Sequence, residues 1–84
     1  MMAGISLFLV WHDAPGASVE IAEPSHPLQP GMLLVRSERT LSRLYHAVKR
    51  QLPAGTALCV APLAEAPKFK GMADGALKWI RSAA

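Results

Sequence analysis

The sequence predicts a small α+β domain, with a mixed β-sheet of about four strands and two helices packed mainly on one face of it. Short apolar runs at residues 5–11, 32–36 and 57–63 are typical of buried strands. Residues 41–52 repeat their apolar side chains every three or four positions, which indicates an amphipathic helix. A chain of 84 residues has room for one domain, so we expect a single domain over residues 1–84.

Two weaker elements are expected between the first two apolar runs. Alternating apolar and polar residues over 17–23 predict an edge-like strand. Residues 24–31 contain three prolines, which argue against a helix or a central strand, and we expect a stiff connecting loop there. Trp11, at the end of the first run, is predicted to lie in the core.

The helix of residues 41–52 is the clearest element. Its apolar face consists of residues at helical spacing, namely Leu41, Leu44, Tyr45, Val48 and Leu52. Ser37 or Thr40 can serve as its N-cap, and Pro53 ends it. The helix lies between two strands, so residues 32–63 are predicted to form a right-handed βαβ unit with parallel strands. A last helix is expected from about Met72 or Asp74 to Ser82.

The order of these segments carries a family resemblance. Residues 32–37, 41–52 and 57–63, followed by Trp79-Ile80-Arg81, give strand, helix, strand and terminal helix, and Leu7 to Val10 with Asp13 would be the first strand. The pattern resembles the ferredoxin-like small domains of the Cas2 and SinR-like group. The resemblance implies a ferredoxin-like sheet and, in a dimer, a metal ion at Asp13 of a metal-dependent nuclease. The family's helix between the first two strands has no counterpart here.

Charge is divided unevenly along the chain. Residues 1–35 contain no Lys or Arg and have a formal charge of −3, whereas residues 36–84 contain all nine basic residues and have a formal charge of +6. Such asymmetry can mark a face that meets an anion. It also arises simply when strands come first and solvated helices second.

The corner between the second apolar run and the helix is the first candidate site. Residues 36–43 combine a helix N-terminus, which attracts anions, with hydroxyl and guanidinium donors. A basic stripe on the helix and a Lys-Phe-Lys loop, whose Phe69 could stack on a base, extend this to a nucleic-acid hypothesis. The candidate residues are Arg36, Ser37, Arg39, Thr40, Arg43, Arg50, Lys68, Phe69 and Lys70. The alternatives are ordinary helix capping with solvated arginines and a surface loop whose Phe69 packs onto the core.

Catalytic signals are sparse. His12 and Asp13 invite a metal or catalytic interpretation, but no His or Cys spacing matches a ligand pattern, and neighbouring strand residues point to opposite faces. Asp13 therefore remains a weak metal candidate, and we expect no enzyme activity and no cofactor.

Cys59, the only cysteine, is expected to be a buried thiol in a reducing compartment. No segment is long enough to span a bilayer, and the first apolar run lacks a preceding basic residue, so we expect a cytoplasmic protein. Two helices leave a face or edge of the sheet uncovered. The primary hypothesis is therefore a non-catalytic interaction module that forms a homodimer. The alternative is a nucleic-acid or phosphate-binding protein.

Overall fold

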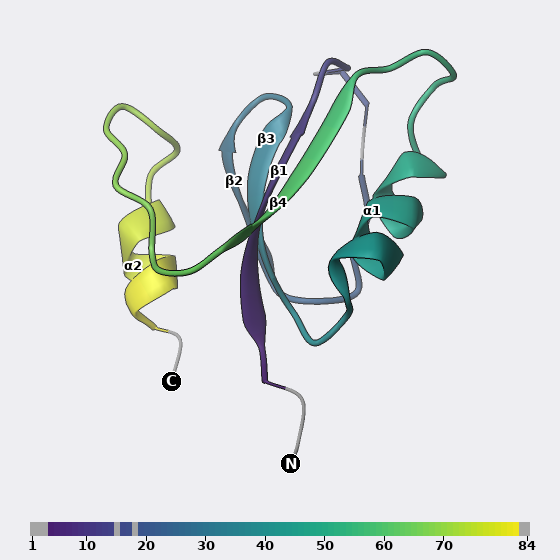
Figure 1. Ribbon diagram of the computed structural model, residues 1–84. Helices are drawn as coiled ribbons and strands as arrows, with labels where there is room; N and C mark the ends of the chain where they lie inside the picture. The colour runs from purple at the N-terminus through teal and green to yellow at the C-terminus, as the bar shows by residue number, and fades with distance from the viewer. Residues whose placement is uncertain (1–3, 15, 18, 83–84) are drawn as a thin grey trace.

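A computed structural model describes residues 4–14, 16–17 and 19–82. Four strands form one sheet in the order β2-β3-β1-β4, and two helices accompany it (Figure 1). Along the chain the elements are β1 (Ser6–His12), β2 (Ser25–Gln29), β3 (Met32–Ser37), α1 (Leu41–Lys49), β4 (Leu58–Leu63) and α2 (Ala76–Arg81). The α+β class with four strands and two helices, predicted from the sequence, is confirmed.

The sheet is antiparallel at every neighbouring pair, in place of the expected mixed sheet. β1 pairs antiparallel with both β3 and β4, so β3 and β4 run in the same direction without touching. The unit of residues 32–63 therefore has its predicted strand directions, but β1 separates its two strands. The physical reason is that β1 is almost wholly apolar, with Phe8 and Val10 buried, and takes a central position between β3 and β4.

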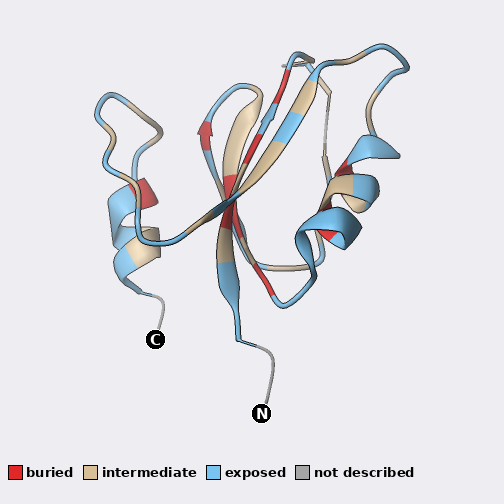
Figure 2. Ribbon diagram, viewed as in Figure 1, coloured by how far each residue is buried: buried red, intermediate tan, exposed pale blue. Residues whose placement is uncertain are grey.

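The helices cover opposite faces of the sheet, so the expectation of one shared face is wrong. Side chains of a strand alternate between faces. Phe8 and Val10 of β1 therefore pack with Leu44 and Val48 of α1, whereas Leu34 packs on the other side with α2. Figure 2 shows buried positions in the middle of the sheet, between the two helices. A sheet whose strands are apolar on both faces is stable only when both faces are shielded from water. Helices packed on a single face would leave the other face exposed.

Thr40 caps α1, as the sequence predicts. Its hydroxyl accepts a hydrogen bond from the backbone N–H of Arg43 at 3.2 Å. Leu44 and Val48 are fully buried, but Leu41, at the edge of the predicted apolar face, is 41% exposed. The alternative cap, Ser37, instead ends β3.

The region between β1 and β3 differs from prediction. Residues 17–23 form no strand among their described positions (Ser18 lies outside them), and the proline-rich stretch contains β2. Pro27 is compatible with β2 because that strand lies at the sheet edge, where a missing N–H costs little. Val19 and Ile21 pack on the α1 side of the core, so residues 19–23 act as a strap over the face.

Two residues expected in the interior lie at the surface. Trp11 is 38% exposed and Cys59 is exposed, because β4 is an edge strand and α2 covers the other end of this face. Neither α1 nor α2 approaches the length and apolar character that a membrane-crossing helix requires, and this holds for the described residues.

Candidate functional site

Arg36 is the first cation of the predicted corner, and its guanidinium group makes its contacts within the protein, with α2. Its Nη2 atom donates to the backbone carbonyls of Trp79 and Ile80 at 2.6 and 2.8 Å, and its guanidinium carbon lies 4.0 Å from the centroid of the Trp79 ring. Carbonyls near a helix C-terminus lack helical partners and favour a positive charge. Arg36 therefore holds α2 against β3.

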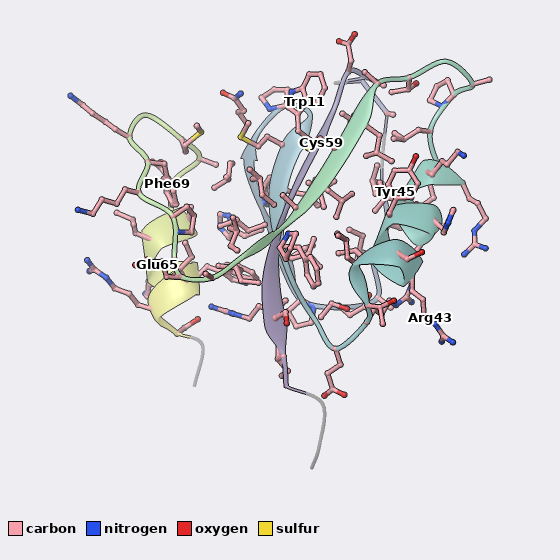
Figure 3. The ribbon with its side chains drawn as sticks, in the orientation of Figure 1. Trp11, Arg43, Tyr45, Cys59, Glu65 and Phe69 are labelled. Carbon is pink, nitrogen blue, oxygen red and sulfur yellow. The ribbon has the colours of Figure 1, made fainter. Side chains whose placement is uncertain are left out.

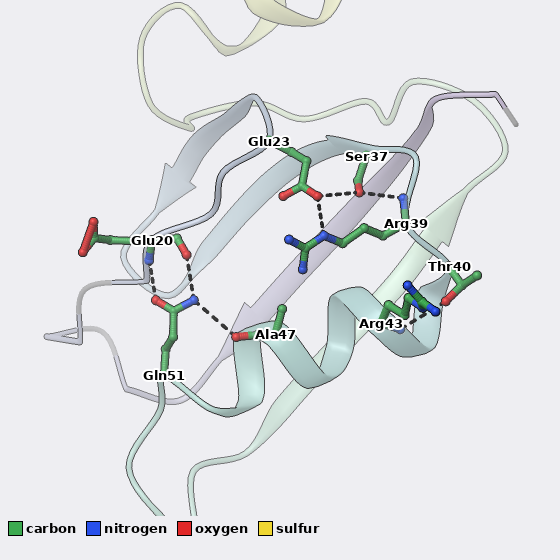
Figure 4. Close-up of polar contacts among 8 residues, drawn as sticks. All are labelled: Glu20, Glu23, Ser37, Arg39, Thr40, Arg43, Ala47 and Gln51. Carbon is green, nitrogen blue, oxygen red and sulfur yellow. Dashed lines mark hydrogen bonds and ion pairs between the residues drawn. The ribbon is translucent and has the colours of Figure 1, made fainter.

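Ser37 and Arg39 converge on a carboxylate from the acidic first part of the chain (Figure 4). The Oε2 atom of Glu23 accepts from the Ser37 hydroxyl at 3.2 Å and pairs with Nε of Arg39 at 2.5 Å. The Ser37 hydroxyl in turn accepts from the backbone N–H of Arg39. The other oxygen of Glu23, Oε1, is enclosed without a partner among the described residues. This corner thus already contains an anion.

A second tie joins the strap to α1. Gln51 donates through Nε2 to the carbonyl of Glu20 and accepts through Oε1 from the Glu20 N–H, both at 2.7 Å (Figure 4). The acidic and basic parts of the chain therefore meet in the fold. Within the corner, Ser37 and Arg39 fasten the strap through Glu23, whereas Arg36 holds α2 and Thr40 caps α1.

The remaining predicted cations lie on two sides of the sheet. Arg43 and Arg50 are exposed on the α1 side, and Figure 3 shows Arg43 pointing away from the sheet. Lys68 and Lys70 are exposed in the loop before α2, while Phe69 between them packs with the core cluster of Leu34 and α2. The fold does not gather the nine predicted residues into one surface, and Phe69 lies partly buried against the core.

His12 and Asp13 diverge, as the strand geometry predicts. His12 is 4% exposed and its Nδ1 atom accepts from the Ala14 N–H at 3.2 Å, whereas Asp13 is exposed. The described part of the chain contains no group of three or more His, Cys, Asp or Glu side chains that could hold a metal ion.

The sequence predicts an uncovered face or edge of the sheet but not its position. In the structure it is the outer edge of β4, together with the exposed side chains of Trp11 and Cys59, which form the Trp11-Cys59 strip. Trp11 lies opposite Cys59 in the β1–β4 register, and both are exposed (Figure 3), whereas Leu7 and Leu63 at the other end of the same strands pack against the α2 cluster. The signal in the sequence was the absence of any charge in residues 57–63. An apolar run without charges is equally typical of a strand buried on both sides.

No family model, no curated protein and no solved structure matches this chain.

Proposed function

We propose that this chain is a non-catalytic interaction module that forms a homodimer through the open edge of β4. The observation that carries the proposal is an edge strand, β4, that has no charged side chain and no neighbouring strand on its outer side among the described residues, and whose Cys59 is exposed together with the adjoining Trp11 of β1. Isolated edges of this kind are templates for pairing with another chain, and proteins normally protect them with charges, prolines or cover.

Backbone hydrogen bonds alternate along β4, so they determine which N–H and carbonyl groups point away from β1. The Asp13 N–H donates to the Ala57 carbonyl at 3.0 Å, so the backbone groups of residues 57, 59, 61 and 63 face β1. Leu58, Val60 and Pro62 therefore direct theirs outward. Pro62 has no N–H, which leaves a donor and an acceptor on each of Leu58 and Val60 and an acceptor on Pro62.

The opposite edge of the sheet is less open. The Ala73 N–H donates to the Leu28 carbonyl at 2.7 Å, so the segment before α2 covers part of β2. Each edge strand contains one proline, Pro27 in β2 and Pro62 in β4, so the cover over β2 is what distinguishes the two edges. This difference between the edges favours β4 as the docking element.

A second copy of the chain is the partner that these features favour. Two β4 strands related by a twofold axis are antiparallel, so the N–H groups of Leu58 and Val60 in each copy can donate to outward carbonyls of the other. No like charges meet, because β4 contains none. The two Trp11-Cys59 strips would then adjoin across the axis, and pairing would continue the sheet from one copy into the next.

The strand order supports a distant kinship with ferredoxin-like domains as part of this proposal. β3, α1 and β4 with β1 inserted between the strands make a split βαβ arrangement. The strap of residues 19–23 stands where that family has its first helix. An exposed thiol at Cys59 suits a reducing compartment, so we propose a cytoplasmic location.

Mass measurement across a dilution series tests the dimer. We expect the wild-type chain to have twice its 9.0 kDa chain mass at high concentration. The substitution Cys59→Lys places two like charges close to the twofold axis without entering either core, so it should raise the dissociation constant at least about tenfold. Cys59→Ser should remain dimeric, as should Gln29→Lys, which places the same charge on the exposed end of β2.

The folded state of each variant is checked by circular dichroism, so that loss of the dimer is not confused with unfolding. A wild-type mass of one chain at every concentration contradicts the proposal. So does a Cys59→Lys protein that is folded and still dimeric with unchanged affinity.

A further inference from the structure

A hollow that is broadly open to solvent lies beside α2. Its volume is about 640 Å³, and only residues of the last loop and of α2 line it. This volume falls in the range of about 300–1,000 Å³ that is typical of small-molecule sites. No residue of β1 or β4 contributes, so the hollow is separate from the proposed dimer edge.

Positive charge dominates the lining. Lys70 reaches the hollow from the loop, and Lys78 and Arg81 from α2, where their spacing of three places them on one helical face. Asp74 is the single acidic residue among those that line it. The only ion pair of the described residues joins Arg39 to Glu23, so these three cations have no carboxylate partner there. The hollow therefore attracts an anion.

The rest of the lining is largely apolar. Phe69, Met72 and Leu77 contribute side chains, and Leu77 is 48% exposed although it is a large aliphatic residue. Apolar surface beside a cation cluster suits a ligand with one compact anionic group and an apolar or aromatic body. Guanidinium and ammonium donors suit the oxygens of a phosphate group.

The distribution of the other cations favours a small molecule over a nucleic-acid strand. A strand needs a basic track along its backbone. Here Arg43, Lys49 and Arg50 belong to α1 and the residue after it, on the far side of the sheet from α2. Three cations around one hollow match a single phosphate group better than a chain of phosphates.

We propose that this hollow binds a phosphorylated small molecule, with the phosphate among Lys70, Lys78 and Arg81 and the organic part against Phe69, Met72 and Leu77. The arginine supplies a planar pair of donors and the lysines supply adjustable point charges. The ligand class is that of phosphate monoesters carrying a ring or an aliphatic body.

Titration of the full chain with adenosine 5′-monophosphate, followed by amide NMR, tests this site. We expect shifts confined to residues 69–81, which adenosine, lacking the phosphate, does not produce. The double substitution Lys78→Gln and Arg81→Gln should weaken binding at least about tenfold, because it removes two of three phosphate-facing charges. Lys49→Gln, a matched change on the exposed side of α1, should leave the affinity unchanged.

Three results would overturn the proposal. The first is the absence of shifts at low salt, and the second is equal binding of adenosine. The third is tight binding of a short single-stranded oligonucleotide with none of the monophosphate, which would assign the cations to nucleic acid. Each readout is independent of oligomeric state, so failure of this site and failure of the dimer are separate results.

Discussion

Arg36 links the sheet to the last helix by three interactions at once. Its guanidinium bonds two carbonyls of α2 and lies over the Trp79 ring. Hydrogen bonds to a charged group are worth about 1.5–3 kcal/mol, and a cation–π contact adds about 0.5–2 kcal/mol. α2 has only six residues, which is too short for a helix to persist alone. This side chain is therefore a main reason that α2 exists.

The substitution Arg36→Met should release α2. We expect amide hydrogen exchange over residues 76–82 to accelerate by at least about tenfold while β1 and β3 keep their protection, since about 1–3 kcal/mol of local stability is lost. Arg43→Met is the matched control, because the Arg43 guanidinium is exposed and forms no hydrogen bond or ion pair within the described part of the chain. Equal exchange in both variants would show that Arg36 does not anchor α2.

The β2–β3 hairpin depends on one glycine. Gln29 pairs with Met32, so Pro30 and Gly31 form the turn, with Gly31 at φ +82°. Proline followed by a residue of positive φ is the pattern of a type II turn. A Cβ atom on Gly31 would lie 2.6 Å from the carbonyl oxygen of His12, and the Gly31 carbonyl accepts from the His12 N–H at 2.8 Å. The turn therefore packs directly on the end of β1.

Gly31→Ala should lower the free energy of unfolding by more than about 2 kcal/mol, because conformational strain and a backbone clash add together. Gly55→Ala separates the two causes. Gly55 has a φ of +86° but nothing within 4 Å of its added Cβ, so only the conformational cost of about 1 kcal/mol applies. Urea unfolding of both variants at equal protein concentration gives the comparison. Equal destabilisation would rule out the predicted clash.

At the scale of the whole molecule, two cores share one sheet. The cluster of Val10 and Leu44 lies on the α1 side, and that of Leu34 and Ala76 on the α2 side. Both draw on β1 and β3, which lie at the centre of the strand order. Neither core can form without the sheet, so we expect the chain to unfold in one cooperative transition.

Leu44→Ala and Leu34→Ala test this coupling from opposite faces. Each should reduce the free energy of unfolding by about 2–5 kcal/mol, since each leucine is fully buried. Far-ultraviolet circular dichroism reports on the whole backbone, and fluorescence reports on the α2 side through Trp11 and Trp79. The two midpoints should coincide in both variants. Separate midpoints for Leu44→Ala would mean that the α1 layer unfolds independently.

Element types were predictable where one local pattern dominated. The helical spacing of apolar residues predicts that α1 is a helix, and the Thr40 cap predicts where it begins. The apolar runs predict the bounds of β1, β3 and β4 to within a residue or two. The sequence predicts a strand at residues 17–23 and a loop at residues 24–31, but the strand β2 lies in the second segment. Proline disfavours a central strand, whereas an edge strand such as β2 accepts it. The corner at residues 36–43 was correctly placed at a helix start, but its Arg36 and Arg39 serve internal contacts.

The sequence by itself determined the α+β class, the amphipathic helix α1 and the three apolar strands, because these follow from the spacing of neighbouring side chains. Only the tertiary structure decided which strands lie at the centre, that the helices cover opposite faces, and that β4 ends the sheet with Trp11 and Cys59 exposed. Strand order and cover depend on contacts between distant segments, and an apolar run has the same appearance in sequence at an edge as at the centre.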